Sequence, residues 1–210
     1  KYPNTDKKIL DNINIIIERN SSIAIVGESG SGKSTFVDIF LGLLVPEKGD
    51  ILVDNKNIKS NLKSWQTNIG YVPQFVFLSD DSIENNIAFG VSKNNIDKNK
   101  IYECLEMAQL KDFVNNLPNG VDTLIGEHGA RLSGGQRQRI GIARSLYNNP
   151  DILVFDEATS SLDHKTENNF IEVVRKLQKE KTIIIISHRL STVKYCNKVL
   201  KIINGKIYEE

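Results

Sequence analysis

The chain has 210 residues, of which 40% are hydrophobic and 25% are charged, and its formal net charge is +1. These values are typical of one ordinary globular domain with a full hydrophobic core, and the neutral balance argues against a nucleic-acid surface or a polybasic membrane patch. The two cysteines, Cys104 and Cys196, lie far apart in the sequence and have no metal-binding or redox spacing. We therefore expect free thiols in a reducing compartment.

No stretch approaches the run of about 18–20 apolar residues that a membrane-spanning helix needs, and there is no signal peptide. The chain begins at Lys1 rather than at methionine, and its only methionine is Met107. We therefore expect a piece of a longer polypeptide, in which a membrane-spanning part lies upstream.

The first third of the chain is predicted to form short strands around one helix. Alternating or continuous apolar segments indicate the strands Ile9–Glu18, Ser22–Val26, Gly49–Val53, Lys56–Ile58 and Ile69–Val72. Asp54-Asn55 is a suitable hairpin turn. A helical pattern follows Lys33 and places Val37, Phe40, Leu41 and Leu44 on one face, and we expect this helix to stop at Pro46.

The rest of the chain alternates between helices and strands. We expect a helical stretch from about Ser82 to Leu117, broken by Pro118-Asn119-Gly120. The remaining predicted elements are a helix over Gly135–Tyr147, a strand over Ile152–Phe155, a helix over His164–Lys179, a strand over Thr182–Ser187, and a hairpin of Val199–Ile203 and Lys206–Tyr208 around Asn204-Gly205. This order predicts an α/β core with a mostly parallel sheet and an inserted helical segment.

The segment Gly27–Ser34 matches the phosphate-binding pattern G-x-x-x-x-G-K-[ST], after a predicted strand and at the start of a helix. Its backbone N–H groups and the helix N-terminus would bind phosphates, while Lys33 reaches the outer phosphates and Ser34 ligates Mg²⁺. The alternative is a chance glycine-rich loop. The residues expected to bind ATP here are Gly27, Glu28, Ser29, Gly30, Ser31, Gly32, Lys33, Ser34 and Thr35.

Polar residues follow three predicted strands, where a parallel sheet binds its ligands. Asp156 would hold Mg²⁺ and Glu157 would deprotonate the attacking water, although acids here could instead cap the following helix. His188 should reach the same edge of the sheet, although a lone histidine is more often a solvated or core residue. Gln74 could contact Mg²⁺ or the water, and taken alone it carries little information.

Ser133-Gly134-Gly135, followed by Gln136, is a second glycine-rich element at a predicted helix start. Its hydroxyl and backbone amides could bind an anion held by another copy of the chain, because one chain already has its own phosphate loop. The alternative is an ordinary helix N-cap. We interpret Arg137, Arg139 and Arg144 as contacts within the helical segment rather than as arginine fingers.

Taken together, these motifs resemble the ATP-binding cassette (ABC) family over nearly the whole chain. The segments that match its named motifs are Gly27–Ser34 (Walker A), Gln74 (Q-loop), Leu132–Gln136 (signature), Ile152–Glu157 (Walker B), Ser161-Leu162-Asp163 (D-loop) and His188 (H-loop). Tyr2 lies where the family places an aromatic residue on adenine. The resemblance implies a RecA-like P-loop core, a small N-terminal antiparallel β-subdomain and an inserted helical subdomain, with residues 1–74 and 150–210 forming the first two and 75–149 the third.

The resemblance also implies partners. Two copies would bind two ATP molecules head to tail, with Asp163 and Glu127 coupling the two sites. Thr123–Gly129 resembles the X-loop of exporters, with His128 where arginine is commoner, and Ser82–Ile87 and the tract that begins at His188 also fit exporters. We therefore expect a transmembrane domain in the same polypeptide, a location on the cytoplasmic face of the inner membrane, and no nucleic-acid partner.

Within exporters, the overall sequence of the chain is similar to those of bacterial polysaccharide or lipid-linked oligosaccharide flippases. One alternative is a soluble ABC ATPase that acts on nucleic acid or ribosomes, but no long coiled coil, cysteine cluster or basic charge supports it. Another is a nucleotide switch or kinase, against which Leu132–Gln136 and the Asp156-Glu157 pair argue.

Overall fold

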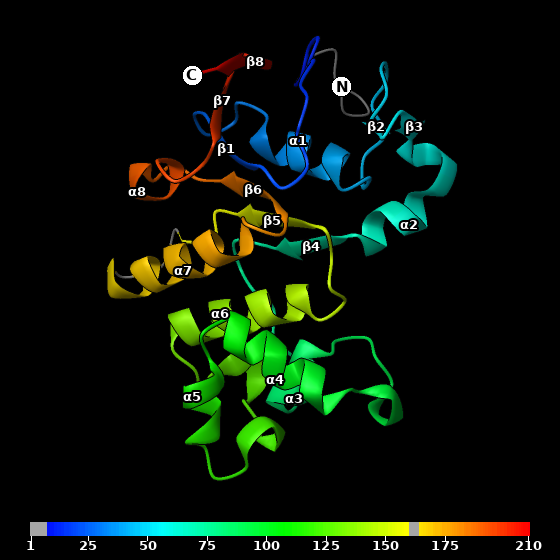
Figure 1. Ribbon diagram of the computed structural model, residues 1–210. Helices are drawn as coiled ribbons and strands as arrows, with labels where there is room; N and C mark the ends of the chain where they lie inside the picture. Colours follow the sequence, from blue (N-terminus) through cyan, green and yellow to red (C-terminus); the bar gives the residue numbers. More distant parts are fainter. Residues whose placement is uncertain (1–7, 160–163) are drawn as a thin grey trace.

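The computed structural model describes residues 8–159 and 164–210 (Figure 1). The strands are β1 (Ser22–Val26), β2 (Leu52–Val53), β3 (Lys56–Asn57), β4 (Ile69–Val72), β5 (Ile152–Asp156), β6 (Thr182–Ile186), β7 (Lys198–Ile203) and β8 (Lys206–Glu209). The α-helices are α1 (Lys33–Phe40), α2 (Leu62–Thr67), α3 (Ile83–Ile87), α4 (Lys98–Met107), α5 (Lys111–Asn115), α6 (Gly134–Leu146), α7 (His164–Leu177) and α8 (Leu190–Val193). Short 3₁₀ turns connect several of them.

The central sheet has the strand order β4-β5-β6-β1-β7-β8. The first five strands in this order are parallel, and β8 pairs antiparallel with β7. β2 and β3 form a separate two-stranded antiparallel sheet. The prediction of a mostly parallel α/β sheet with a small antiparallel sheet is therefore confirmed. The inner strand β6 is buried along its whole length, which explains why isoleucine fills all of it after Thr182.

Helices cover both faces of this sheet (Figure 1). On one face, Phe36 and Val37 of α1 pack with alternate residues of the parallel strands, among them Ile25, Val154 and Ile184. The other residues of the same strands point to the opposite face, where they pack with α6 and α7. This alternation lets one short strand supply two separate cores.

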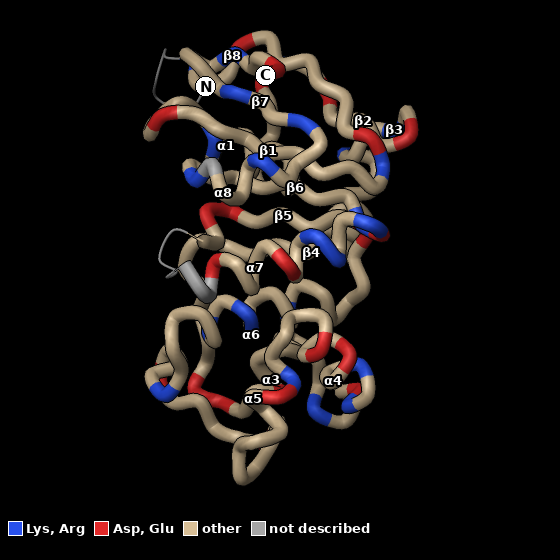
Figure 2. Tube along the Cα trace, turned by 60° about the vertical axis from the view of Figure 1, so that its left-hand side comes forward, with Lys and Arg blue, Asp and Glu red and all other residues tan. Residues whose placement is uncertain are grey.

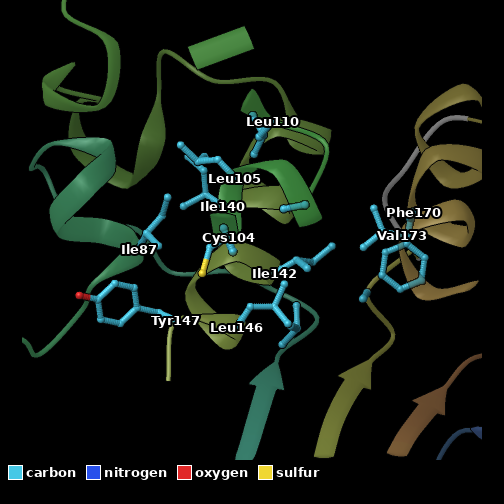
Figure 3. Packing of buried hydrophobic residues seen from close by; sticks show 14 of the residues in the cluster. Ile87, Cys104, Leu105, Leu110, Ile140, Ile142, Leu146, Tyr147, Phe170 and Val173 are labelled. Atoms are coloured by element: carbon cyan, nitrogen blue, oxygen red, sulfur yellow. The ribbon is translucent and has the colours of Figure 1, made fainter. Parts of the chain in front are cut away.

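The helices between β4 and β5 form a lobe beside the sheet (Figure 1). Figure 3 shows Ile140, Leu105 and Leu110 meeting at the centre of this lobe, with Phe170 and Val173 of α7 farther along the same continuous cluster. The cluster therefore joins the lobe to the face of the sheet that α7 covers. Gly70 allows this contact, because a Cβ atom there would lie 2.5 Å from the Ser145 carbonyl oxygen of α6.

The predicted strand over residues 9–18 is wrong. The structure has no strand there, although the side chains do alternate, with Ile13, Ile15 and Ile17 partly buried against the core and Ile16 75% exposed. A strand requires a partner for its backbone as well as an alternating pattern. The backbone bond from Asp11 to the Gly205 carbonyl oxygen, at 2.8 Å, does not extend into a ladder.

The helix after Lys33 ends at Phe40, earlier than Pro46. Gly42 has a φ of 72°, and the amides of Leu43 and Leu44 donate to the Asp38 carbonyl oxygen at 2.8 and 3.1 Å, which closes the last turn. Leu44 therefore lies outside the helix, and the prediction that Pro46 stops it is wrong. Both predicted hairpin turns are confirmed, because their central residues all have the positive φ of a type I′ turn: Asp54, Asn55, Asn204 and Gly205.

Candidate functional site

The phosphate loop connects β1 to α1, and its lysine lies inside the loop. Lys33 is 7% exposed, and its Nζ donates to the carbonyl oxygens of Gly27 and Glu28 at 2.8 and 2.9 Å. Burial lowers the pKa of the Lys33 ammonium, and the charges of Glu157 and Asp156 oppose that shift. The structure thus brings a buried cation and two carboxylates to one edge of the sheet.

The loop also has the properties that a phosphate-binding site requires. Ser31 Oγ is buried and has no hydrogen-bond partner among the described residues, although a buried hydroxyl normally finds one. A Cβ atom at Gly27 would lie 2.7 Å from the Ile202 carbonyl oxygen and from Ser31 Oγ, so only glycine fits there. A bound phosphate oxygen would satisfy the Ser31 hydroxyl, and the lysine would supply the positive charge.

The site also suits Mg²⁺ that arrives with phosphates. Mg²⁺ is commonly held by one or two carboxylates together with substrate phosphate oxygens. Asp156 and the exposed Ser34 hydroxyl offer oxygen ligands, and Gln74 carries an amide oxygen. Among the described residues no group of three or more histidine, cysteine or acidic side chains could hold a metal by itself. The oxygen ligands present therefore fit a phosphate-borne ion.

Asp156 ends β5 and has a neighbour that sequence reasoning missed. The Tyr71 hydroxyl of β4 donates to Asp156 Oδ2 at 3.2 Å. Tyr71 is paired with Val154 in the sheet register, so it shares a face with the aspartate two residues later. Burial is the main cause of a raised Asp156 pKa, with the Tyr71 hydrogen bond acting against it. Only the register between two distant strands could have indicated this contact.

Glu157, Gln74 and His188 meet at the carboxyl ends of three strands. Gln74 Nε2 donates to Glu157 Oε2 at 2.9 Å, and His188 Nε2 lies 3.1 Å from Glu157 Oε1. The two carboxylate oxygens therefore face two different neutral or ionisable partners. The Glu157 side chain is 24% exposed, so water can still reach it.

Ser133 forms the N-cap of α6. Its hydroxyl accepts a hydrogen bond from the Gln136 amide at 3.2 Å, and Gln136 Oε1 accepts one from the Ser133 amide at 2.8 Å. This capping box is the ordinary reading that the sequence left open. Ser133 and Gly134 are nevertheless exposed at the start of a 13-residue helix, so their surface remains accessible to another molecule.

The arginines of α6 bind the helical lobe itself, as expected. Arg137 Nη1 donates to the Leu132 carbonyl oxygen and Arg139 Nη1 to that of Gln109, at 2.7 and 2.9 Å. Arg144 reaches the Asn86 carbonyl oxygen at 2.7 Å.

For the other predicted site residues the structure gives fewer contacts. The exposed Glu127 side chain lies 3.9 Å from that of His128. Tyr2 and Asp163, the predicted adenine and dimer-coupling residues, lie outside the described residues. Among the described residues no helix is long and apolar enough to cross a membrane.

Residues 10–160 match the family described as ABC transporter. The chain is 41% identical over 209 residues to an ATP-dependent lipid A-core flippase of Idiomarina loihiensis. The aligned region covers 99% of this chain and 36% of the flippase. It is 42% identical over 211 residues to the alpha-hemolysin translocation ATP-binding protein HlyB of Escherichia coli, over 100% of this chain and 30% of that protein.

A solved structure of a bacterial Atm1-family ABC exporter with ATP bound is also similar. It superposes with a TM-score of 0.89 at 37% identity, over 99% of this chain and 36% of that one. The P-loop fold class predicted from the motifs is therefore confirmed. The chain spans about a third of the length of these relatives.

Proposed function

The chain belongs to the ABC transporter family as an ATPase domain, and on this premise we propose that two copies associate head to tail around two Mg-ATP to drive an exporter. The observation that carries the proposal is the Glu157 carboxylate, held by Gln74 and His188 beside a phosphate loop with an unsatisfied Ser31 hydroxyl. A second, exposed glycine-rich helix start at Ser133 gives each chain a surface for its partner's nucleotide.

Bound Mg-ATP supplies the transferable phosphoryl group and a metal charge that offsets its negative charge. The chain's own residues would hold the nucleotide and its ion and would activate the attacking water. Lys33 and the loop amides bind the phosphate oxygens, while Ser34, Asp156 and Gln74 provide oxygen ligands for the ion. Glu157 accepts a proton from water at its carboxylate, and His188 keeps that carboxylate oriented.

The membrane partner is proposed to be a transmembrane domain of the same polypeptide, because the relatives are about three times as long as this chain. A set of exposed aromatic and aliphatic side chains offers a docking surface on the helical insert, which we assign to residues 75–149. These side chains, 57–79% exposed, are Phe75, Phe77, Phe89 and Leu124. The domain would then lie on the cytoplasmic face of the inner membrane.

The transported molecule is proposed to be a membrane substrate such as a lipid-linked oligosaccharide or a polysaccharide precursor. The similar flippase is described as acting on lipid A-core, which supports an amphiphilic glycolipid. HlyB, described as translocating alpha-hemolysin, shows that an equally similar domain serves another cargo. A soluble ABC ATPase for nucleic acid is less favoured, because positive and negative residues are interspersed over the sheet and the helical lobe in Figure 2.

The hydrolytic roles are tested with two variants. Glu157→Gln should retain ATP binding and lower kcat by at least about 100-fold, the contribution expected of a general base. Lys33→Ala should instead raise the Kd for ATP, because it removes the charge that binds phosphate, whereas Lys48→Ala, a change at an exposed lysine, serves as control. Nucleotide titration and phosphate release separate these effects. Normal turnover in Glu157→Gln would exclude Glu157 as the base.

A further inference from the structure

One buried carboxylate plays no part in the site described above. Glu167 lies on α7 and is 3% exposed. Its Oε2 forms an ion pair with Arg189 Nη1, and its Oε1 accepts a hydrogen bond from the Ser191 hydroxyl. Both partners follow His188 within three residues, so this carboxylate ties the histidine's segment to α7.

The ion pair and the hydrogen bond of Glu167 hold this segment firmly, because the carboxylate is buried. Removing a carboxylate from water is costly unless charged or polar partners replace its hydration. Here each oxygen has a different partner, so the segment is held at two points rather than one. Breaking either contact would remove a group that replaces the hydration of this buried charge, which makes the bound arrangement the favoured one.

His188 has few other side-chain restraints within residues 8–159 and 164–210. Its side chain is 48% exposed, and the contact described for it is the 3.1 Å approach to Glu157. On its N-terminal side, the Ser187 amide donates to the Ile25 carbonyl oxygen of β1 at 3.3 Å, and Ser187 Oγ accepts from the Arg189 amide at 3.0 Å. On its C-terminal side, Glu167 is a side-chain anchor of the segment.

We propose that Glu167 is a positioning residue for His188: it fixes the segment of residues 189–191 against α7 and thereby holds the imidazole on Glu157. The inference rests on the proposed function, because it gives Glu167 a role only through the histidine. The contacts described for Glu167 are with Arg189 and Ser191 rather than with Glu157 or the phosphate loop. Its removal should therefore affect turnover and leave nucleotide binding unchanged.

The first test measures ATP hydrolysis by the full chain with Glu167→Gln, which keeps the side-chain shape but removes the charge. We expect kcat to fall about tenfold and the KM for ATP to change less than about twofold, since only the orientation of the histidine is disturbed. Glu172→Gln is the matched control, because this exposed glutamate lies on the same helix. It should leave both constants unchanged.

The decisive comparison adds Glu167→Gln to His188→Ala. If Glu167 acts through His188, the double variant should have the same kcat as His188→Ala alone. An equal tenfold loss in both backgrounds would overturn the proposal, because it would show a general structural role. An unchanged kcat in Glu167→Gln would also overturn it.

A second readout does not depend on activity. The chain has three histidines, so NMR can identify the His188 ring signals as those missing in His188→Ala. These signals should shift in Glu167→Gln while those of His128 do not. Ser191→Ala, which keeps the ion pair, should give the same pattern with a smaller loss of kcat, and unshifted His188 signals in both variants would overturn the proposal.

The two hypotheses fail differently. If Glu157→Gln and His188→Ala both hydrolyse ATP at the normal rate, the roles proposed for the site are wrong. If those variants are impaired and only Glu167→Gln behaves like the unchanged chain, the inference about Glu167 alone is wrong.

Discussion

Glu157 has a backbone φ of 49°, a conformation that non-glycine residues seldom adopt. Such a conformation costs of order 1 kcal/mol or more and persists where the surrounding structure enforces it. Here the Glu157 amide donates to the Ile186 carbonyl oxygen at 2.9 Å, which joins the turn after β5 to the end of β6. This strained turn thus places the Glu157 carboxylate beside the histidine that follows β6.

The two cysteines give a pH prediction at the same scale. Burial raises the pKa of the Cys104 thiol to about 11 and that of Cys196 to about 12. At pH 8 both should therefore react slowly with iodoacetamide in the folded chain and quickly after unfolding in urea, because the thiolate is the nucleophile. Fast labelling of the folded chain would contradict the burial of these thiols.

The same shifts affect stability. An ordinary cysteine has a pKa of 9.0, so the unfolded chain loses these protons at lower pH than the folded chain does. The free energy of unfolding should consequently decrease as the pH rises from about 9 towards 12. The decrease should be smaller in the double variant Cys104→Ala and Cys196→Ala, measured by urea unfolding; an equal decrease would show that the thiols do not contribute.

At the scale of elements, the helix α6 combines two roles at its N-cap residue. Ser133 caps the helix within its own chain, and the proposed function also places it against the partner's nucleotide. Aspartate is as good an N-cap as serine but adds a negative charge. We therefore predict that Ser133→Asp keeps the melting temperature within a few degrees and abolishes ATP hydrolysis.

The measurement for this prediction is a thermal melt beside a hydrolysis assay. Ser133→Ala is the comparison, because it loses the cap and should cost about 0.5–2 kcal/mol of stability while adding no charge. Normal hydrolysis by a stable Ser133→Asp would mean that Ser133 serves only as a cap.

The contact between β4 and α6 gives a second prediction at this scale. A Cβ atom at Gly70 would lie 2.5 Å from the Ser145 carbonyl oxygen and 2.7 Å from Leu153 Cδ2, and the backbone oxygen cannot easily yield. Gly70→Ala should therefore destabilise the chain by about 1–3 kcal/mol, as overpacked cores do. Urea unfolding measures this, and unchanged stability would show that the lobe can shift away from the sheet.

An element of the fold is predictable when the local sequence determines it, and less so when contacts with distant residues do. The bounds of β1 and β4 were predicted correctly, because short apolar runs there end at Gly27 and Pro73. The strand over residues 9–18 failed because its alternating pattern does not reveal whether a neighbouring strand will pair with it. The short helix α2 was also missed; its Trp65 indole donates to the Phe40 carbonyl oxygen at 2.7 Å, a tertiary contact that local propensity does not show.

The candidate site shows the same division. Lys33 and Glu157 could be proposed as site residues from contiguous motifs, because phosphate binding and a buried strand end have local signatures. Tyr71 and Glu167 were not found, because their partners lie 85 and 22 residues away in the chain. Sequence motifs therefore predict candidate ligand-binding groups, whereas the residues that contact those groups from distant parts of the chain require the fold.

At the scale of the whole molecule, the proposed function requires two chains to complete each site. Lys33 and Glu157 lie at one edge of the sheet, whereas Ser133 is exposed at the start of α6. In the proposed head-to-tail pair, each ATP contacts the first two residues from one copy and Ser133 from the other. A chain with a defective Glu157 and a chain with a defective Ser133 should therefore form one intact site between them.

The most direct measurement is ATP hydrolysis by an equimolar mixture of Glu157→Gln and Ser133→Asp, after titration has confirmed that each variant binds ATP. Each variant alone should be inactive, because both of its sites carry the same defect. Mixing should restore activity, up to about a quarter of the unchanged chain's rate if pairing is random and the sites act independently. A mixture no more active than the two variants measured separately would contradict the proposed head-to-tail pair.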